Sequence, residues 1–449
     1  MISPELFRKY DVPVPRYTSY PTVPHWTDAP TTDEWQRSLA LAASPADASL
    51  ALYVHVPFCE SLCTFCGCNT VITRDHGKGA PYVDLVLREL DRYLELVPAL
   101  ASRPVRQLHL GGGTPTFLSS TELSRLIDGI GARVQIAGQF CEGSIEVDPR
   151  VTSAEQLQVL FDKGITRVSL GVQDIDPEVQ RLVNRRQPLE MTKTLCASAR
   201  AIGYSSINVD LIYGLPGQTI ASTHALSEAI AELRPDRLAV YSFALVPWIK
   251  PAQRKFKDED VPAGEDKRAL YEVIRERLLG EGYVEIGLDH FALPTDSLAR
   301  AAEEGTLHRN FMGYAERRTD ALVGLGVSAI SETADCYHQN EKVLAVYERR
   351  AQAGELPTLR GHKLTLDDRR RRAKILSLMT TFQAGLDAED LIDVRPQLEP
   401  LAQDAVVQLS GNHVTVPVEG RPFLRNAAAC FDAYLHAGAN GERRHSRSV

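Results

Sequence analysis

The sequence predicts an α/β fold of parallel strands joined by helices, and it favours a barrel over an open doubly wound sheet. Short apolar runs alternate about six times with longer amphipathic stretches, which is typical of parallel strands with helical crossovers. Polar residues and glycines follow the end of strand after strand, where barrels place their sites. The chain also lacks the Gly-x-Gly-x-x-Gly turn of a dinucleotide-binding doubly wound sheet.

Each element is expected from its local pattern, in chain order. Residues 13–21 are punctuated by proline and cannot continue a helix, so the chain begins with an extended arm. Apolar runs predict strands at 50–56, 106–110, 144–148, 167–174, 206–213 and 237–243. Helical spacing and capping residues predict helices at 82–100, after the caps at 119–123, and at 153–163, 191–203, 223–233 and 267–280.

The pattern loosens beyond about residue 294. Residues 305–314 are expected to form a loop and 320–330 an apolar strand, both returning to the mouth of the barrel. A small hairpin is expected from 405–409 and 413–417. The arginine run 369–372 follows two aspartates and has no aromatic residues between its charges, which favours a solvated helix face over a nucleic-acid patch. The predicted organisation is an arm (1–40), a barrel (41–295), a connecting segment that lines the site (296–360) and a mostly helical C-terminal domain (361–449).

Composition narrows the class of protein. The chain has 449 residues, 44% of them hydrophobic, which is ordinary for an ordered globular protein. A net charge of −8 and a pI of about 5.9 provide no global basic field for nucleic acid. No secretory signal and no apolar stretch long enough to span a bilayer is visible. We therefore expect a cytoplasmic protein without a membrane or nucleic-acid partner, and the lack of a large apolar surface stripe favours a monomer.

The most informative stretch is a cysteine-rich loop that directly follows the strand at 50–56. It contains Cys59, Cys63, Cys66 and Cys68, half of the chain's 8 cysteines. An intracellular cluster of this kind indicates a thiolate metal site more than a disulfide framework. A structural zinc site would normally need a second Cys-x-x-Cys knuckle, which is absent. The spacing C-x-x-x-C-x-x-C instead supplies three thiolates for an iron–sulfur cluster with one open iron.

This loop is the signature of the radical S-adenosylmethionine (SAM) superfamily, and the chain resembles the oxygen-independent coproporphyrinogen III oxidases. The resemblance extends from Pro15 to about Tyr434 and includes the additional Cys68 after the triad. It implies an incomplete (β/α)6-type barrel that is open on one side. It also implies a [4Fe–4S] cluster and two molecules of SAM, one bound near Cys68.

Several residues have a plausible place in such a site. The backbone of Gly111–Gly113 would allow the amino-acid part of SAM to approach closely, although a tight strand-to-helix turn is an alternative. Glu146 and Asp148 alternate with apolar residues, so both should point to one face, where ribose hydroxyls or the SAM ammonium would suit them. The resemblance implies that Cys59, Cys63 and Cys66 bind the cluster, and it implies catalytic roles for Cys68, Tyr53 and Glu146. It further assigns SAM contacts to Tyr53, Phe65, Cys68, Gly112, Gly113, Thr114, Glu146, Gln173, Arg185, Asp210, Ala244 and Ile330.

The implied reaction removes a hydrogen from the β-carbon of a propionate of coproporphyrinogen III with a 5′-deoxyadenosyl radical. Loss of carbon dioxide and one electron leaves a vinyl group, and two such events give protoporphyrinogen IX. An electron donor such as a flavodoxin or ferredoxin would be required. Because the substrate is anionic and the chain acidic, we expect local basic groups near the barrel mouth, with Arg16, Arg185 and Arg309 as candidates.

Two alternatives remain. Relatives of the same fold include haem-binding chaperones, which lack the cysteine that corresponds to Cys68, and a radical SAM tetrapyrrole methyltransferase or haem-opening enzyme would reuse a second SAM. The chain departs from the family pattern at Met312, where the family has glutamine, and in residues 315–319. Any contact made by that glutamine cannot be transferred to this chain.

Overall fold

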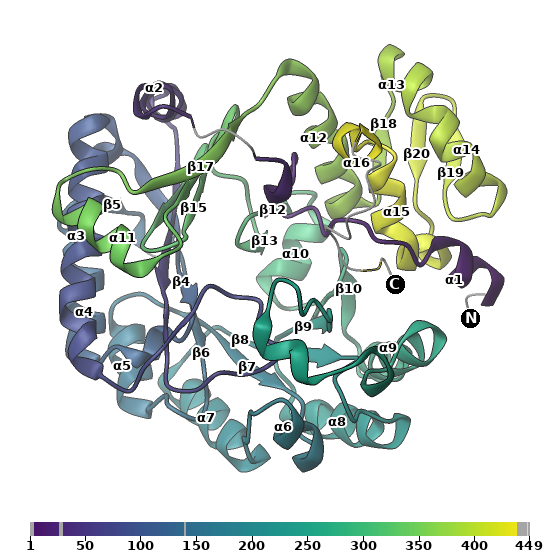
Figure 1. The fold of residues 1–449 in the computed structure, drawn as a ribbon, viewed down its shortest axis with the longest axis horizontal. Helices are drawn as coiled ribbons and strands as arrows, with labels where there is room; N and C mark the ends of the chain where they lie inside the picture. Colours follow the sequence, from purple (N-terminus) through teal and green to yellow (C-terminus); the bar gives the residue numbers. More distant parts are fainter. Residues whose placement is uncertain (1–3, 27–29, 139–140, 438–446, 448–449) are drawn as a thin grey trace.

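The computed structural model describes residues 4–26, 30–138, 141–437 and 447, and its centre is a curved mixed sheet (Figure 1). Six parallel strands form the barrel part in the order β1-β4-β6-β7-β8-β9. Their bounds are β1 (Leu50–Val56), β4 (Pro104–Gly112), β6 (Glu142–Val147), β7 (Arg167–Gln173), β8 (Ser206–Tyr213) and β9 (Arg237–Ser242). The predicted α/β class and each predicted barrel strand are therefore confirmed.

Helices cover the outer face of this sheet. They are α3 (Gly79–Leu96), α4 (Ser120–Gly131), α5 (Ala154–Asp162), α6 (Pro177–Leu182), α7 (Leu189–Ile202), α8 (Ile220–Leu233) and α9 (Gly264–Gly280). Ser119 begins α4 through a reciprocal capping box with Glu122, as its sequence indicates. The helix predicted at 82–100 ends earlier, at Leu96, because Pro98 begins a separate 3₁₀ turn.

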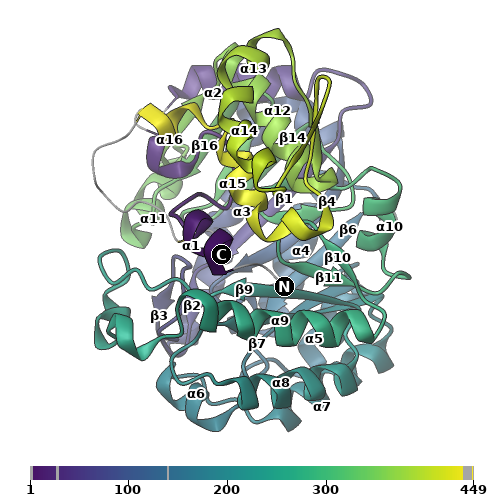
Figure 2. The ribbon, with the colours of Figure 1, turned by 90° about the vertical axis from the view of Figure 1, so that its right-hand side faces the viewer.

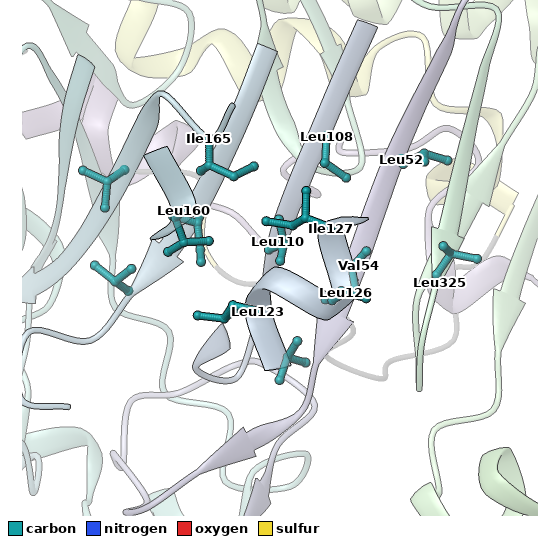
Figure 3. Close-up of a cluster of buried hydrophobic side chains, with 14 of the residues drawn as sticks. Leu52, Val54, Leu108, Leu110, Leu123, Leu126, Ile127, Leu160, Ile165 and Leu325 are labelled. Atoms are coloured by element: carbon teal, nitrogen blue, oxygen red, sulfur yellow. The ribbon is translucent and has the colours of Figure 1, made fainter. Parts of the chain in front are cut away.

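The main core lies between the strands and these helices. Leu52, Val54, Leu108 and Leu110 point outward from β1 and β4 and are almost fully buried (Figure 3). They belong to the same apolar cluster as Leu123, Leu126 and Ile127 of α4. Burial of each such side chain contributes roughly 1.5–3 kcal/mol. Because side chains alternate along a strand, the residues between them must point into the barrel.

The sheet extends beyond the six strands at both ends. On one side β14 (Ala321–Leu325) pairs parallel with β1 and is followed by antiparallel β15 (Ile330–Glu332), β16 (Cys336–Asn340) and β17 (Thr358–Lys363). On the other side β11 (His290–Ala292) and β10 (Val284–Ile286) pair antiparallel next to β9. Remaining elements of this part are α2 (Thr32–Ala42), β2 (Phe58–Cys59), β3 (Val71–Ile72), β5 (Gln135–Ile136), α10 (Ser297–Glu303) and α11 (Leu344–Gln352).

The segment 305–314 is not the loop that we expected. Its residues form a short antiparallel hairpin, β12 (His308–Asn310) with β13 (Gly313–Ala315). The side chain of Asn310 accepts a hydrogen bond from the Met312 N–H, and Gly313 has a φ of 117°, which closes the tight turn. The strand expected at 320–330 is divided into β14 and β15, with Gly326 and Ser328 at positive φ between them.

The C-terminal residues form a helical unit with a small sheet (Figure 2). Its elements are α12 (Leu366–Thr381), β18 (Gln383–Gly385), α13 (Ala388–Asp393), α14 (Arg395–Gln403), β19 (Gln408–Ser410), β20 (His413–Thr415), α15 (Leu424–Ala429) and α16 (Ala433–Ala437). The predicted hairpin is confirmed as β19–β20, to which β18 adds a third strand.

The prediction of a solvated arginine face on α12 is wrong for most of the run. Arg370 pairs with Asp367 and with Asp390 of α13, and Arg371 pairs with Asp393. Arg372 pairs with Glu332 of β15. Arg369 alone of the four is exposed. Sequence spacing could reveal only Asp367 on the same helix, because the other acidic partners come from α13 and from the main sheet.

The N-terminal arm packs against the C-terminal unit. Helix α1 (Pro4–Tyr10) and the following segment place Phe7, Tyr10, Tyr17 and Tyr20 in one apolar cluster with residues of α12 and α15. Figure 2 shows α1 between this unit and α9. The predicted domain boundaries stay predictions, but those after residues 40 and 360 fall inside α2 and β17. Within the described residues, no helix has the length and hydropathy that a bilayer span requires.

Candidate active site

The cysteine loop lies at the carboxyl end of β1 and is fixed by hydrogen bonds to the turn after α6. The Thr64 N–H donates to the Val183 carbonyl at 3.0 Å, and the Asn184 side chain donates to the Leu62 carbonyl at 2.7 Å. Cys59, Cys63, Cys66 and Cys68 are all free thiols. The loop is therefore held in place by the neighbouring α6 region while its sulfur atoms stay available for ligands.

The surroundings act in both directions on the sulfur atoms: hydrogen-bond donors lie close to two of them, but burial raises the pKa of Cys59 to about 11. Arg150 and Arg185 each place a guanidinium nitrogen 3.5 Å from Cys63 Sγ, and the Thr114 hydroxyl lies 3.4 Å from Cys59 Sγ. The pKa of Cys66 is lowered to about 6, chiefly by a hydrogen bond from Cys68. Positive groups and hydrogen-bond donors stabilise the ligand form of cysteine. The donor set is thus chemically suited to an iron–sulfur cluster.

The cysteines do not converge as ligands of one ion. Among the described residues, no group of three or more His, Cys, Asp or Glu side chains could hold a single metal ion. A structural zinc site requires such convergence. The thiolates of an iron–sulfur cubane bind different iron atoms and need not meet at one point.

The inner face of the barrel is polar and encloses a cavity of about 120 Å³. Barrel interiors are usually filled with branched apolar side chains. Here the inward positions carry hydrogen-bonding groups instead. The cavity lining includes Gln107 and His109 from β4, Ser144 and Glu146 from β6, Ser169 from β7, Asn208 and Asp210 from β8, and Tyr241 from β9.

The glycines at the end of β4 make room beside the cysteine loop. A Cβ atom on Gly113 would lie 2.6 Å from the Pro57 carbonyl oxygen and 2.8 Å from that of Phe58. Gly112 has a φ of 109°, and a Cβ there would meet the His55 ring at 2.5 Å. The Gly113 and Thr114 N–H groups donate to Val56 and Phe58. Side chains at these positions would force β1 and β4 apart, so the glycines are required by backbone contact as well as available to a ligand.

Glu146 lies beside this glycine backbone. Its Oε2 accepts a hydrogen bond from the Gly112 N–H at 3.0 Å, and its Oε1 lies 3.5 Å from His109 Nε2. Burial raises the pKa of Glu146, but the His109 and Gly112 hydrogen bonds outweigh it and leave the pKa below its usual range. Tyr53 stacks on His109, with ring centroids 5.8 Å apart. A charged carboxylate therefore faces the cavity, where it can accept hydrogen bonds from a ligand.

We predict that Glu146→Gln raises the KM for SAM by about 10- to 100-fold, the value of one charge-assisted hydrogen bond. Glutamine keeps the shape of the side chain but loses its charge. SAM-dependent activity would be titrated against SAM, with iron content measured in parallel. Glu155→Gln, an exposed position on α5, is the control. An unchanged KM for SAM would remove Glu146 from the SAM pocket.

Asp148 does not share the environment of Glu146, contrary to our expectation. It lies beyond the end of β6 and pairs with Arg150 at 2.6 Å and with Arg185 at 3.1 Å. Burial raises the pKa of Asp148, and the arginines more than reverse this. Its hydrogen-bonding capacity is thus directed to the protein, and its part in the site is to orient Arg185 beside Cys63.

Asp210 lines the barrel cavity, and Gln173 lies at the end of β7 near Gly171. Gln173 ends β7 with a φ of 68°, and its buried Oε1 has no hydrogen-bond partner within the described part of the chain. Asp210 accepts hydrogen bonds from Ser169 and Asn208, and its pKa is raised to about 6 by burial and then by Glu146. An unsatisfied buried acceptor and a carboxylate that lines the cavity both suit the hydroxyl donors of a sugar.

The structure distributes the remaining predicted SAM residues around the loop and the sheet. Phe65 packs against an apolar cluster that includes Val183 and Leu215, and Ala244 follows β9. Ile330 is buried with Trp26 and Tyr337, and only its backbone approaches Gly324, the β-partner of Tyr53. Contact of these side chains with SAM stays a prediction.

Sequence reasoning missed several residues of the cavity. His55 bridges the Tyr53 hydroxyl at 3.0 Å and the Asn69 carbonyl at 2.9 Å. His109, Tyr241 and His290 also line or border the cavity. The sequence could have indicated His55 and His109. Each lies two residues after another polar side chain on a predicted strand, Tyr53 and Gln107 respectively, and therefore on the same face. His290 comes from β11, which we did not predict.

The expected basic groups are only partly brought together. Arg16 and Arg309 are neighbours, with a guanidinium nitrogen of Arg309 3.5 Å from the Arg16 carbonyl oxygen. Arg185 lies apart from them, beside Asp148 and Cys63. Met312, where the chain departs from the family pattern, lines the cavity. A side chain at this position therefore does face the site.

Comparisons with known proteins agree with this geometry. Residues 53–230 match the family described as the radical SAM superfamily. The partial barrel and three-cysteine loop thus define a radical SAM protein. The chain is 42% identical over 448 residues to the oxygen-independent coproporphyrinogen III oxidase of Escherichia coli, covering 97% of this chain and 96% of that protein. It is 40% identical over 447 residues to the enzyme of the same name from Pseudomonas aeruginosa, covering 96% and 95%.

The solved structure described as the coproporphyrinogen III oxidase from Escherichia coli, a radical SAM enzyme, superposes with a TM-score of 0.88 at 41% identity, covering 93% of this chain and 97% of that one. The chain belongs to the family of oxygen-independent coproporphyrinogen III oxidases. Membership confirms the predicted fold class and implies the predicted cofactors, a [4Fe–4S] cluster and SAM.

Proposed function

We propose that this chain converts coproporphyrinogen III to protoporphyrinogen IX without oxygen, by oxidative decarboxylation of two propionate side chains to vinyl groups. The observation that carries this proposal is the nearly full-length likeness to enzymes of that name, in a chain that keeps the three-cysteine loop beside a polar barrel cavity. The reaction belongs to anaerobic porphyrin and haem synthesis.

The residues of the site have two roles: some hold the cofactors, and others enclose the reaction. Cys59, Cys63 and Cys66 would hold the cluster, and the Gly112–Thr114 backbone with Glu146, Gln173 and Asp210 would hold SAM. When bound, these cofactors supply a carbon radical that can remove hydrogen from an unactivated carbon. The inward polar side chains fix the orientation of both substrates, and the surrounding core keeps bulk water away from the radical.

The proposal extends to partners. A second SAM would lie near Cys68, the exposed cysteine of the loop. One-electron reduction would come from a flavodoxin- or ferredoxin-like donor that approaches this exposed side of the loop. We propose a monomer, because large exposed apolar residues such as Leu41, Leu366 and Ile392 lie on three different helices. We place the protein in the cytoplasm.

The test is an anaerobic incubation of iron- and sulfide-reconstituted protein with dithionite, SAM and coproporphyrinogen III, read by liquid chromatography with mass detection. Protoporphyrin, after oxidation, together with 5′-deoxyadenosine is expected, and Cys59→Ala should lose both products. A methylated tetrapyrrole would favour a methyltransferase. Stoichiometric haem binding without SAM cleavage would favour a haem chaperone.

A further inference from the structure

Arg309 is a buried arginine with unused hydrogen-bonding groups. It lies on β12 and is 4% exposed. Its guanidinium lies 4.4 Å from the centre of the Tyr314 ring, and one nitrogen approaches the Arg16 carbonyl oxygen at 3.5 Å. Its Nε and Nη1 are buried and have no hydrogen-bond partner among the residues that the structure describes. Burial of a charged group without partners is costly.

Two other arginines with little exposed side chain, Arg237 and Arg372, do have carboxylate partners. Arg237 pairs with Asp296 at 2.5 Å and with Glu316 at 3.1 Å, and Arg372 pairs with Glu332. Among the described residues no ion pair involves Arg309, and its basic neighbour Arg16 is paired with Asp289. Asp289 in turn contacts His290 Nδ1 at 2.6 Å. Asp289 is therefore already shared between Arg16 and His290, and Glu332, which lines the same small pocket as Arg309, is paired with Arg372.

Arg309 itself lines a small pocket of about 10 Å³ with Tyr17 and Glu332, and the neighbouring residues of its hairpin reach the barrel cavity. Asn310, Met312 and Tyr314 of the same hairpin line the barrel cavity together with Glu146 and Asp210. The charge of Arg309 reaches into this region, since Arg309 contributes to lowering the pKa of His290 to about 3, after burial as the main cause. Arg16 also borders a second cavity of about 1,120 Å³ between α9 and the C-terminal unit, which is large enough for a tetrapyrrole.

We infer that Arg309, with Arg16 beside it, forms a carboxylate subsite that binds one propionate of the tetrapyrrole substrate. This inference rests on the proposed function. Arginine donates charge-assisted hydrogen bonds to carboxylates, and the Nε and Nη1 of Arg309, on different edges of its guanidinium, each lack a partner within the described residues. A propionate held in this way is stabilised as a carboxylate and resists loss of carbon dioxide. The subsite therefore holds a propionate that is not reacting while another is oxidised.

The test compares ligands with and without carboxylates on the reconstituted protein with SAM present. Binding of coproporphyrin III, the air-stable form of the tetra-acid, and of its tetramethyl ester would be followed by fluorescence titration. Arg309→Met should weaken binding of the tetra-acid about 10- to 100-fold, as expected for a lost charge-assisted pair, and leave the ester unchanged. Arg309→Lys, which keeps the charge but loses the guanidinium Nε and Nη1 donors, should fall between. Arg369→Met, the same change at the exposed position of α12, is the control.

Thermal stability distinguishes this subsite from a structural role. Arg309→Met should keep or raise the melting temperature of the ligand-free protein, because it removes an uncompensated buried charge. Arg237→Met should lower it, because that arginine is paired. Three results would each overturn the subsite. Arg309→Met could bind the tetra-acid as the parent does, it could lose affinity for the acid and the ester equally, or its melting temperature could fall as in Arg237→Met. Wild-type protein that binds the tetra-acid through Arg309 but never decarboxylates coproporphyrinogen III would keep the subsite and refute the proposed function.

Discussion

Replacement of Cys63 by alanine should reduce formation of 5′-deoxyadenosine and protoporphyrin to the background of the assay. Cys63 is the buried cysteine of the loop, and two guanidinium groups lie 3.5 Å from its sulfur. The cofactor carries the difficult chemistry, so loss of one of three ligands removes the reaction rather than slowing it. Iron and sulfide per chain after anaerobic reconstitution would be measured together with both products.

A cysteine-to-alanine change outside the loop serves as the control, because it distinguishes loss of a cluster ligand from a general loss of folding. Cys141 is half-buried and lies outside the loop. Cys141→Ala should keep the iron content and the activity of the parent protein. If Cys63→Ala retained a full cluster and turned over SAM, the assignment of the three ligands would be wrong.

Gly113→Ala should abolish most SAM binding and lower stability by about 1–3 kcal/mol, the usual cost of inserting a methyl group into a packed region. The new Cβ would lie 2.6 Å from one backbone oxygen and 2.8 Å from another, and backbone cannot rotate away as a flexible side chain can. Strands β1 and β4 would have to separate at the point where the SAM backbone contacts are expected. Denaturant unfolding and SAM titration by calorimetry would measure the two effects.

Gly131→Ala provides the comparison, because its Cβ would meet only Ile136 at an ordinary 3.6 Å and would add helix propensity at the end of α4. This variant should be as stable as the parent or slightly more so. A Gly113→Ala protein with parental stability and parental SAM affinity would contradict the close approach of the two strands.

The barrel strands and the cysteine loop could be predicted from the sequence because both depend on local patterns. Apolar runs predict the strands, and the cysteine spacing of the loop predicts three thiolate ligands. The two acids of β6 show the limit of this reasoning. Alternation predicted one face for Glu146 and Asp148, yet the strand ends at Val147 and Asp148 turns to Arg150 and Arg185. Partners distant in sequence decided the role of that carboxylate.

The segments outside the barrel depended even more on tertiary contacts. The hairpin β12–β13 has only three residues in each strand, too few for a clear periodicity. The burial of the arginines of α12 could not be predicted from the sequence, because Arg370 and Arg372 have partners on α13 and β15. Arg309 was expected near the barrel mouth from the charge of the substrate, but its unpartnered state could be recognised only once its neighbours were known.

The central claim is that a radical formed at the cysteine loop removes hydrogen from the β-carbon of a propionate. Coproporphyrinogen III with deuterium at these β-carbons, incubated anaerobically with the reduced protein and SAM, tests it most directly. The account predicts protoporphyrin together with 5′-deoxyadenosine that has gained one deuterium atom. Unlabelled 5′-deoxyadenosine formed alongside a chemically unchanged tetrapyrrole would contradict it.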